Sequence, residues 1–153
     1  MSYYDINYAV QDAVATYLTT NKATYASGVA SALPVIKSGE FEDRARDHIF
    51  VHCQTASGDQ HNTGMMRCRL TVGVATVRET TTATHRNYCK AIFDLVMDAG
   101  FAGYLTGATL TVIQRLPQVE FQTSTLTDSM RAAMAELVII AVYNPPAVPP
   151  PAP

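Results

Sequence analysis

Several histidines and cysteines have side chains that could hold a metal ion, namely His52, Cys53, His61, Cys68, His85 and Cys89. His85 and Cys89 are four residues apart, so on a helix they would share one face. His52 and Cys53 are adjacent, so on a strand they would point to opposite sides. Cys68 and Cys89 each lie within an apolar stripe, where a thiol packs as a small hydrophobic group. The spacing matches no closed four-ligand pattern, and we predict structural cysteines with no metal and no cofactor.

The same residues give weak support to nucleophilic catalysis. His85 and Cys89 form the one local thiol–imidazole pair, and one helical turn is a poor geometry for in-line attack on a substrate. The sequence contains no GxSxG, GxxxxGK or GxGxxG motif. We therefore predict that the chain is not an enzyme, with a small enzyme using His85 or Cys89 as the alternative.

Composition favours a protein that hides part of its surface against partners. The 153 residues include 11 Lys and Arg against 13 Asp and Glu, giving a net charge of −2. This balance argues against sequence-specific binding of nucleic acid, which needs a basic excess. Charged residues make up 16% of the chain, below the roughly 25% of an average soluble domain. A protein with so few charges has less polar surface to expose to water.

The sequence also indicates the compartment of the protein and whether it associates with a membrane. The longest strongly apolar run, residues 137–142, is far too short to cross a bilayer, so no membrane partner is expected. The first residues lack a basic segment followed by an apolar stretch, so no signal peptide is expected. Three cysteines are an odd number without CxxC spacing, which favours a reducing compartment over a disulfide framework.

The elements in the first half are a helix and two strands. Apolar residues from Ile6 to Leu18 recur at three- and four-residue steps and predict an amphipathic helix. Residues 22–41 predict a loop, with one short helical or strand piece left open. Residues 49–53 alternate as a strand does. Residues 66–74 alternate most clearly, with an apolar face opposite a face that carries arginines.

The second half predicts a helix and two more strands. Threonines at 80–82 and 84 offer N-cap candidates for a helix whose apolar stripe runs from Tyr88 to Ala99. A strand is expected over 109–116, stopped by Pro117, with an extension past that break left open. Residues 136–143 predict a buried strand, and 129–135 fit either a helix or the start of that strand. The order α-β-β-α-β-β predicts an α+β two-layer sandwich, in which helices cover a mainly antiparallel four-stranded sheet.

These elements form one domain over residues 1–143, followed by a proline-rich tail over residues 144–153. Proline lacks an amide donor, so the tail cannot extend the sheet. We expect it to be extended polyproline II or disordered.

Two surface regions are candidate contact sites. Basic residues on the second strand and beyond it would meet acidic residues of a neighbouring subunit, or they form an ordinary solvated face. The candidate interface residues are Arg67, Arg69, Arg78, Glu40, Glu42 and Asp43. A polar loop rich in glycine is a candidate docking element. Its residues are Ser57, Gly58, Asp59, Gln60, His61, Asn62, Thr63 and Gly64.

The arrangement resembles the tail terminator (tail-completion) proteins of tailed bacteriophages. The resemblance covers roughly residues 4–143. It rests on the order of the helices and strands, on the length of the chain and on the general character of its sequence. Three stretches carry it: Asp5-Ile6-Asn7-Tyr8-Ala9-Val10, then Met66 to Val77 leading into Thr84-His85-Arg86-Asn87-Tyr88, and Glu136 to Tyr143. The proline-rich end and the length of residues 22–41 depart from the family pattern.

The resemblance implies a non-enzymatic virion protein that forms a homo-hexameric ring. Such a ring caps the tail tube, stops its polymerisation and joins it to the neck. The implied partners are the tail tube protein and a neck or head–tail connector protein, with assembly in the host cytoplasm. The alternatives are another phage neck, tube or completion protein, or an adaptor whose proline tail docks in an aromatic groove.

Overall fold

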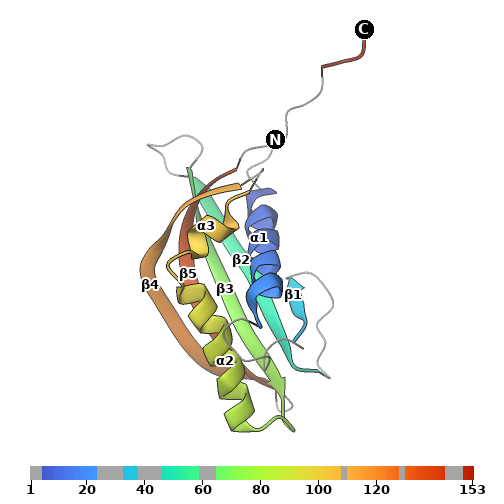
Figure 1. The fold of residues 1–153 in the computed structure, drawn as a ribbon, viewed down its shortest axis with the longest axis vertical. Helices are drawn as coiled ribbons and strands as arrows, with labels where there is room; N and C mark the ends of the chain where they lie inside the picture. Colours follow the sequence, from blue (N-terminus) through green and yellow to red (C-terminus); the bar gives the residue numbers. More distant parts are fainter. Residues whose placement is uncertain are drawn as a thin grey trace.

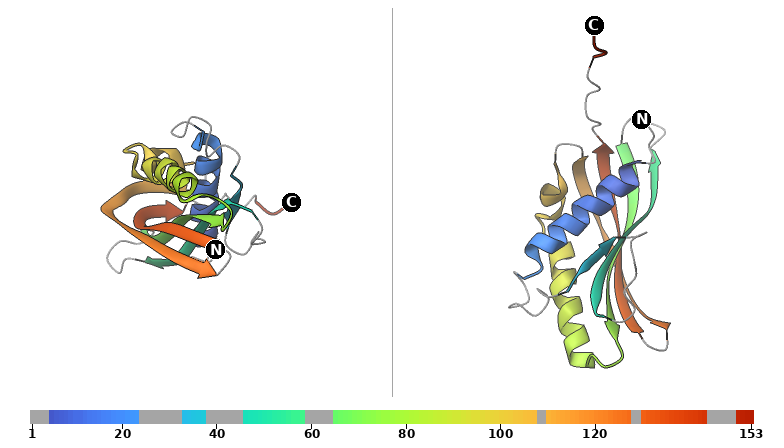
Figure 2. Two further views of the ribbon diagram at one scale, coloured as in Figure 1. Left: turned by 90° about the horizontal axis from the view of Figure 1, so that it is seen from below. Right: turned by 90° about the vertical axis from the view of Figure 1, so that its right-hand side faces the viewer.

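The computed structural model describes residues 5–23, 33–37, 46–58, 65–107, 110–127, 130–143 and 150–153. Within these ranges, three helices lie on one face of a five-stranded mixed sheet (Figures 1 and 2). The strand order across the sheet is β1-β2-β3-β5-β4. The predicted α+β class is confirmed, with differences in the number and order of the elements.

Helix α1, Asp5–Asn21, forms where the apolar period predicted a helix. Its inward face is fully buried and consists of Ile6, Val10, Val14 and Leu18. This face packs mainly on β2 and β1 and crosses the sheet obliquely (Figure 2). The Tyr17 hydroxyl donates a hydrogen bond to the Leu95 carbonyl oxygen at 2.7 Å, which ties α1 to the end of the next helix.

Strands β2, His48–Gly58, and β3, Met65–Val77, form an antiparallel pair that supplies much of the core. The alternation predicted for 66–74 appears in burial from Met66 to Leu70, whereas residues 71–76 are buried on both faces of the strand. The first two residues of the predicted docking loop are strand rather than loop, and the docking role of the loop stays a prediction. Ser57 and Gly58 belong to β2, where they pair with β3, and residues 59–64 lie outside the described residues.

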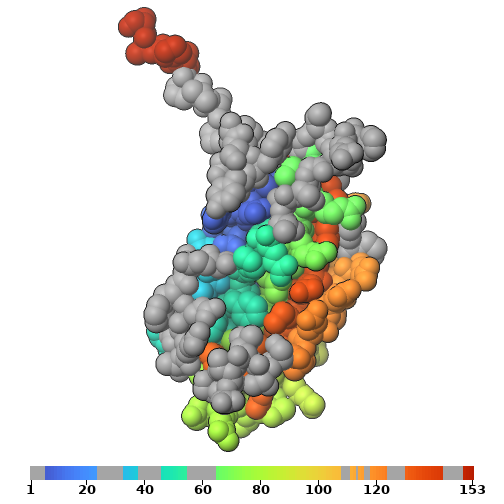
Figure 3. Space-filling model, turned by 180° about the vertical axis from the view of Figure 1, so that it is seen from behind, coloured from blue at the N-terminus to red at the C-terminus, as the bar shows by residue number. Residues whose placement is uncertain are grey.

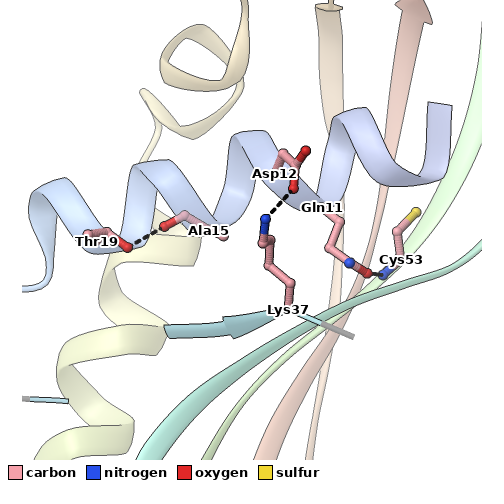
Figure 4. Close-up of polar contacts among 6 residues, drawn as sticks. All are labelled: Gln11, Asp12, Ala15, Thr19, Lys37 and Cys53. Atoms are coloured by element: carbon pink, nitrogen blue, oxygen red, sulfur yellow. Dashed lines mark hydrogen bonds and ion pairs between the residues drawn. The ribbon is translucent and has the colours of Figure 1, made fainter. Parts of the chain in front are cut away.

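A fifth strand makes the sheet mixed, so the prediction of four strands was wrong. Strand β1, Val35–Lys37, lies parallel to β2 within the segment for which the sequence left a short strand open. Helix α1 supports this side of the sheet from above (Figure 4). The Gln11 side-chain oxygen accepts from the Cys53 amide at 3.1 Å, and Asp12 forms an ion pair with Lys37 at 3.0 Å.

Two helices connect β3 to the opposite edge of the sheet. Helix α2, Thr82–Met97, begins at an N-cap that the threonine run supplies, because the Thr81 hydroxyl accepts from the Thr84 amide at 3.2 Å. It buries Ile92, Leu95 and Val96. The short helix α3, Phe101–Leu105, follows and packs against α1 and the next strand.

Strand β4, Leu110–Thr127, continues through Pro117, so the predicted stop at that residue was wrong. The pairing with β5 shifts between Arg115 and Val119, and β4 lies at the edge of the sheet. An edge strand with a bulge tolerates proline, because no neighbour on the outer side requires its missing donor.

Strand β5, Met130–Tyr143, occupies the interior of the sheet between β3 and β4. For residues 129–135 the sequence fitted either a helix or a strand. From Met130 onward these residues form strand. The order is therefore α-β-β-β-α-α-β-β instead of α-β-β-α-β-β. Residues 144–149 lie outside the described residues, and the separate role of the tail remains a prediction.

Candidate functional site

The thiol–imidazole pair lies under α2, against the sheet. His85 and Cys89 are both buried, and the Cys89 sulfur lies 3.5 Å from His85 Nε2. On the other side of the imidazole, Nδ1 lies 2.8 Å from the hydroxyl of Thr76 in β3. Burial raises the pKa of the Cys89 thiol to about 11, so the thiol is protonated near neutral pH. This geometry supports a polar contact that fixes α2 on the sheet.

Burial lowers the pKa of His85, and the nearby Arg131 guanidinium adds to this, while Asp47 acts in the opposite direction. Asp47 is held in place by the Val77 amide at 2.8 Å and by the Thr80 hydroxyl. A neutral imidazole is therefore the form that the folded chain prefers near neutral pH.

We expect this preference to make stability depend on pH. The unfolded chain takes up a proton on His85 near pH 6.5, whereas the folded chain resists it. Stability is therefore fully present above about pH 6.5 and falls as the pH is lowered through the unfolded value. Urea denaturation between pH 7.5 and 5.5 measures this, with His85→Gln as the control that should flatten the slope. Equal slopes for the two proteins would contradict the assignment to His85.

The other two cysteines face the core between β2 and β3. Cys53 and Cys68 are free thiols, and both are buried. The pKa of the Cys53 thiol is raised above its ordinary value by a side-chain hydrogen bond that this thiol donates to Cys68, and by burial. His52 is adjacent to Cys53 on the same strand and lies on the other face, opposite Thr71. Among the described residues, no three His, Cys, Asp or Glu side chains come together as a metal site would need.

The predicted basic residues divide between two places. Arg67 and Arg69 are exposed on the face of β3 that points away from the helices, because Cys68 and Leu70 between and beside them face the core. Arg78 is exposed in the turn after β3 and does not belong to this face. Glu40, Glu42 and Asp43, the predicted acidic partners, lie outside the described residues, so the predicted pairing stays a prediction.

We call the surface of the sheet opposite the helices the open face (Figure 3). Its centre is apolar because β5 carries apolar side chains on both sides. Leu137, Ile139 and Ala141 are buried toward the helices. On the open face, Met134, Val138, Ile140 and Val142 are each partly exposed, and Glu136 interrupts this apolar series. A solvated outer face of an antiparallel sheet usually carries polar residues at such positions.

Charges of both signs lie beside and within this apolar strip, because Glu136 belongs to β5 itself. Arg67 lies directly opposite Ile140, and Arg69 opposite Val138, so both arginines border the strip on its β3 side. Toward β4, Glu120 lies directly opposite Glu136. Sequence reasoning missed this acidic pair, since the alignment of β4 with β5 includes three register shifts and no sequence signal fixed it.

The arginines and the glutamates of the open face do not form ion pairs with each other. Within the described part of the chain, the ion pairs found are Lys37 with Asp12 and Lys90 with Asp94, both away from this face. The side-chain amide of Gln118 donates a hydrogen bond to the Glu120 carboxylate at 3.3 Å. The open face thus presents apolar, basic and acidic groups that are available to a partner.

No helix in the described part of the chain combines the length and the apolar character needed to cross a bilayer.

No protein-family model and no curated protein matches this sequence. Several solved structures are similar to this chain, and they include a chain from the virion of a native gene transfer agent particle, with a TM-score of 0.55 and 14% sequence identity. The match covers 94% of this chain and 100% of that chain. At this identity the likeness concerns the fold and assigns no role to individual residues. The two chains share one fold over nearly their whole lengths.

Proposed function

We propose that this chain is a structural protein of a phage-like virion, which forms a ring that caps the tail tube and joins it to the neck. The fold shared with a gene transfer agent virion chain supports the virion role. The resemblance of the sequence to phage tail terminators supports the position at the tail end and a ring of six subunits. The tail tube protein on one side and a neck or connector protein on the other are the proposed partners.

The observation that carries the proposal is the open face. Its partly exposed apolar strip is bordered by Arg67 and Arg69 on β3, interrupted by Glu136 on β5 and bordered by Glu120 on β4, and is a surface suited to a protein partner. Repeated head-to-tail contacts close into a ring when the rotation per subunit divides a full turn. The raised pKa of the Cys89 thiol agrees with a structural role for the His85–Cys89 pair rather than a catalytic one.

We expect the purified protein to assemble into closed rings. Native mass spectrometry across a wide concentration range should give a discrete multiple of the 16.6 kDa subunit, and negative-stain electron microscopy should show rings of matching size. A species of six subunits is the expected result. A monomer at every concentration would contradict self-assembly.

The same images separate the possible places of the protein in a virion. A terminator should give single rings that do not lengthen, because its role is to stop polymerisation. A tail tube subunit should instead stack into tubes of variable length. Tubes in place of rings would therefore reject the terminator role while retaining a structural role in the tail.

A further inference from the structure

We propose that the proline-rich tail of one subunit, residues 144–153, docks on the open face of the next subunit, along the apolar side chains of Val138, Ile140 and Val142. We call these three residues the β5 strip. The inference rests on the proposed ring and identifies two surfaces that meet at each contact in it. The tail and the β5 strip are different surfaces, so the contact repeats head to tail, as a ring requires.

The first step is the chemistry of the tail. Six of its ten residues are proline, and none of its side chains carries a charge. Proline has no amide donor, whereas every residue of the tail has a carbonyl oxygen that accepts hydrogen bonds. In polyproline II these carbonyl oxygens make no internal hydrogen bonds. The tail therefore fits a surface that is apolar and that also supplies hydrogen-bond donors.

The second step is that the β5 strip offers both properties. Its side chains are partly exposed, and Figure 3 shows β5 at the surface between β3 and β4. The exposed Arg67 and Arg69 lie directly opposite Ile140 and Val138, and a guanidinium group carries several donors and no acceptor. On the β4 side, the exposed Gln114 lies directly opposite Ile140. The β5 strip is thus an apolar surface with donors on both sides.

The rest of the open face suits the tail less well. Glu136 interrupts the apolar series of β5 and lies directly opposite Glu120 of β4. Carboxylates accept hydrogen bonds and donate none, so they cannot serve the carbonyl oxygens of the tail. The residues paired directly with the β5 strip include no acid, and they are Met65, Arg67, Arg69, Thr111 and Gln114.

The third step decides between the tail of the same chain and the tail of a neighbour. The tail follows Tyr143, the last residue of β5, so reaching its own β5 strip requires a reversal of the chain directly after the strand. Asn144 and Pro145 each precede a proline, and residues in that position are biased toward extended conformations. Proline also cannot adopt the positive φ that a type II turn needs. The sequence therefore favours a tail that leads away from its own sheet and toward a neighbour.

The length of the tail agrees with this assignment. Polyproline II rises about 3.1 Å per residue, so the tail can span about 31 Å. The β5 strip, from Val138 to Val142, rises about 14 Å along the strand. About half of the tail is enough to cover the strip, and the other half is left to bridge the two subunits. Pro150 to Pro153 are exposed on their own subunit.

Photocross-linking in the full chain tests the contact directly. Val148 is replaced by the photoreactive residue p-benzoylphenylalanine, and this protein is assembled with unaltered protein that carries heavy isotopes. We expect covalent dimers in which position 148 of the light chain is joined to residues 138–142 or to the adjacent part of β3 in the heavy chain. Irradiation after the rings have been dissociated by dilution is the control, and it should give no such dimers.

A cycle of variants measures what the contact contributes to assembly. One variant replaces the tail by a glycine–serine sequence of the same length, and the other carries Arg67→Ala and Arg69→Ala. We expect each to assemble at least about tenfold more weakly than the unaltered protein in a dilution series followed by native mass spectrometry. Both variants remove the same contact, so combining them should weaken assembly no further.

Tyr104→Ala is the matched control for the choice of surface. Tyr104 of α3 is 64% exposed and is an aromatic side chain of the kind on which proline-rich segments dock. This variant should assemble normally. Far-UV circular dichroism should show that each variant folds. If the arginine variant does not fold, the cross-linking experiment still decides, because it leaves the β5 strip unaltered.

The outcomes separate this inference from the proposed function. If the unaltered protein stays monomeric, the ring function fails and this contact fails with it. If rings form but the cross-links are absent, stay within one chain or reach another surface such as Tyr104, the ring function stands and the inference is overturned. Additive losses in the combined variant also overturn it, because the tail and the arginines then act at separate contacts.

Discussion

Replacing Phe101 by alanine is expected to lower the free energy of unfolding by about 3–5 kcal/mol, which is the usual cost of removing an enclosed aromatic ring. The Phe101 side chain is 1% exposed and is the largest of the fully buried side chains among the described residues. Its ring meets the ring of Tyr17 edge-on, with centroids 5.3 Å apart. Phe101 also begins α3, so its loss should loosen the contact between α3 and α1. Urea denaturation at fixed protein concentration, followed by circular dichroism, measures the change.

Phe121→Ala is the matched control, because it removes the same ring from an exposed site. The Phe121 side chain is 53% exposed and contacts Phe93 of α2 with centroids 5.2 Å apart. We expect a loss of less than about 1.5 kcal/mol, the range of one aromatic contact. Similar losses at the two positions would mean that Phe101 does not anchor α3 as the structure indicates.

The spacing of apolar residues was sufficient to predict those helices and strands that bury only one face. Helix α1 and the first part of β3, up to Leu70, each bury a single side against the core, so the period of their apolar residues reports that side directly. The cap at Thr81 is also local, since its partner is the amide of Thr84. These features depend on residues close together in the sequence.

The features that sequence reasoning missed depend on long-range arrangement. Whether Pro117 stops a strand depends on whether β4 is at an edge, and β4 is at the edge because β5 inserts between it and β3. Strand β1 has three residues, too few to give a period, and exists because β2 offers it an edge. Neither the edge position of β4 nor the existence of β1 can be predicted from the residues of those strands alone.

Only part of the candidate surface was predicted, because the rest depends on how distant strands pair. The alternation of β3 was enough to place Arg67 and Arg69 on an outer face. The acidic pair of Glu120 and Glu136 required the register of two strands with several irregularities between them. The apolar side chains of β5 toward this face were interpreted as burial within the sheet, whereas the structure leaves them partly exposed.

Replacing Gly73 by alanine is expected to cost about 1–3 kcal/mol, although alanine is usually the better residue within a strand. Gly73 lies directly opposite Phe50, whose ring covers it on the open face. A Cβ atom at Gly73 would lie 2.1 Å from Cζ of Phe50 and 2.5 Å from Cε1. The methyl group and the ring cannot both keep their places, so the ring must move off the sheet. The same denaturation experiment measures the loss.

A double-mutant cycle with Phe50→Ala tests this cause. Once the ring is removed, the methyl group meets no obstacle, and the lower backbone entropy of alanine in the unfolded chain favours it by about 0.5–1 kcal/mol. Gly73→Ala should therefore destabilise the unaltered protein and stabilise the Phe50→Ala variant, with a coupling energy above about 1 kcal/mol. Additive effects would show that the ring already has room to move. The glycine would then be needed for some reason other than the space that Phe50 occupies.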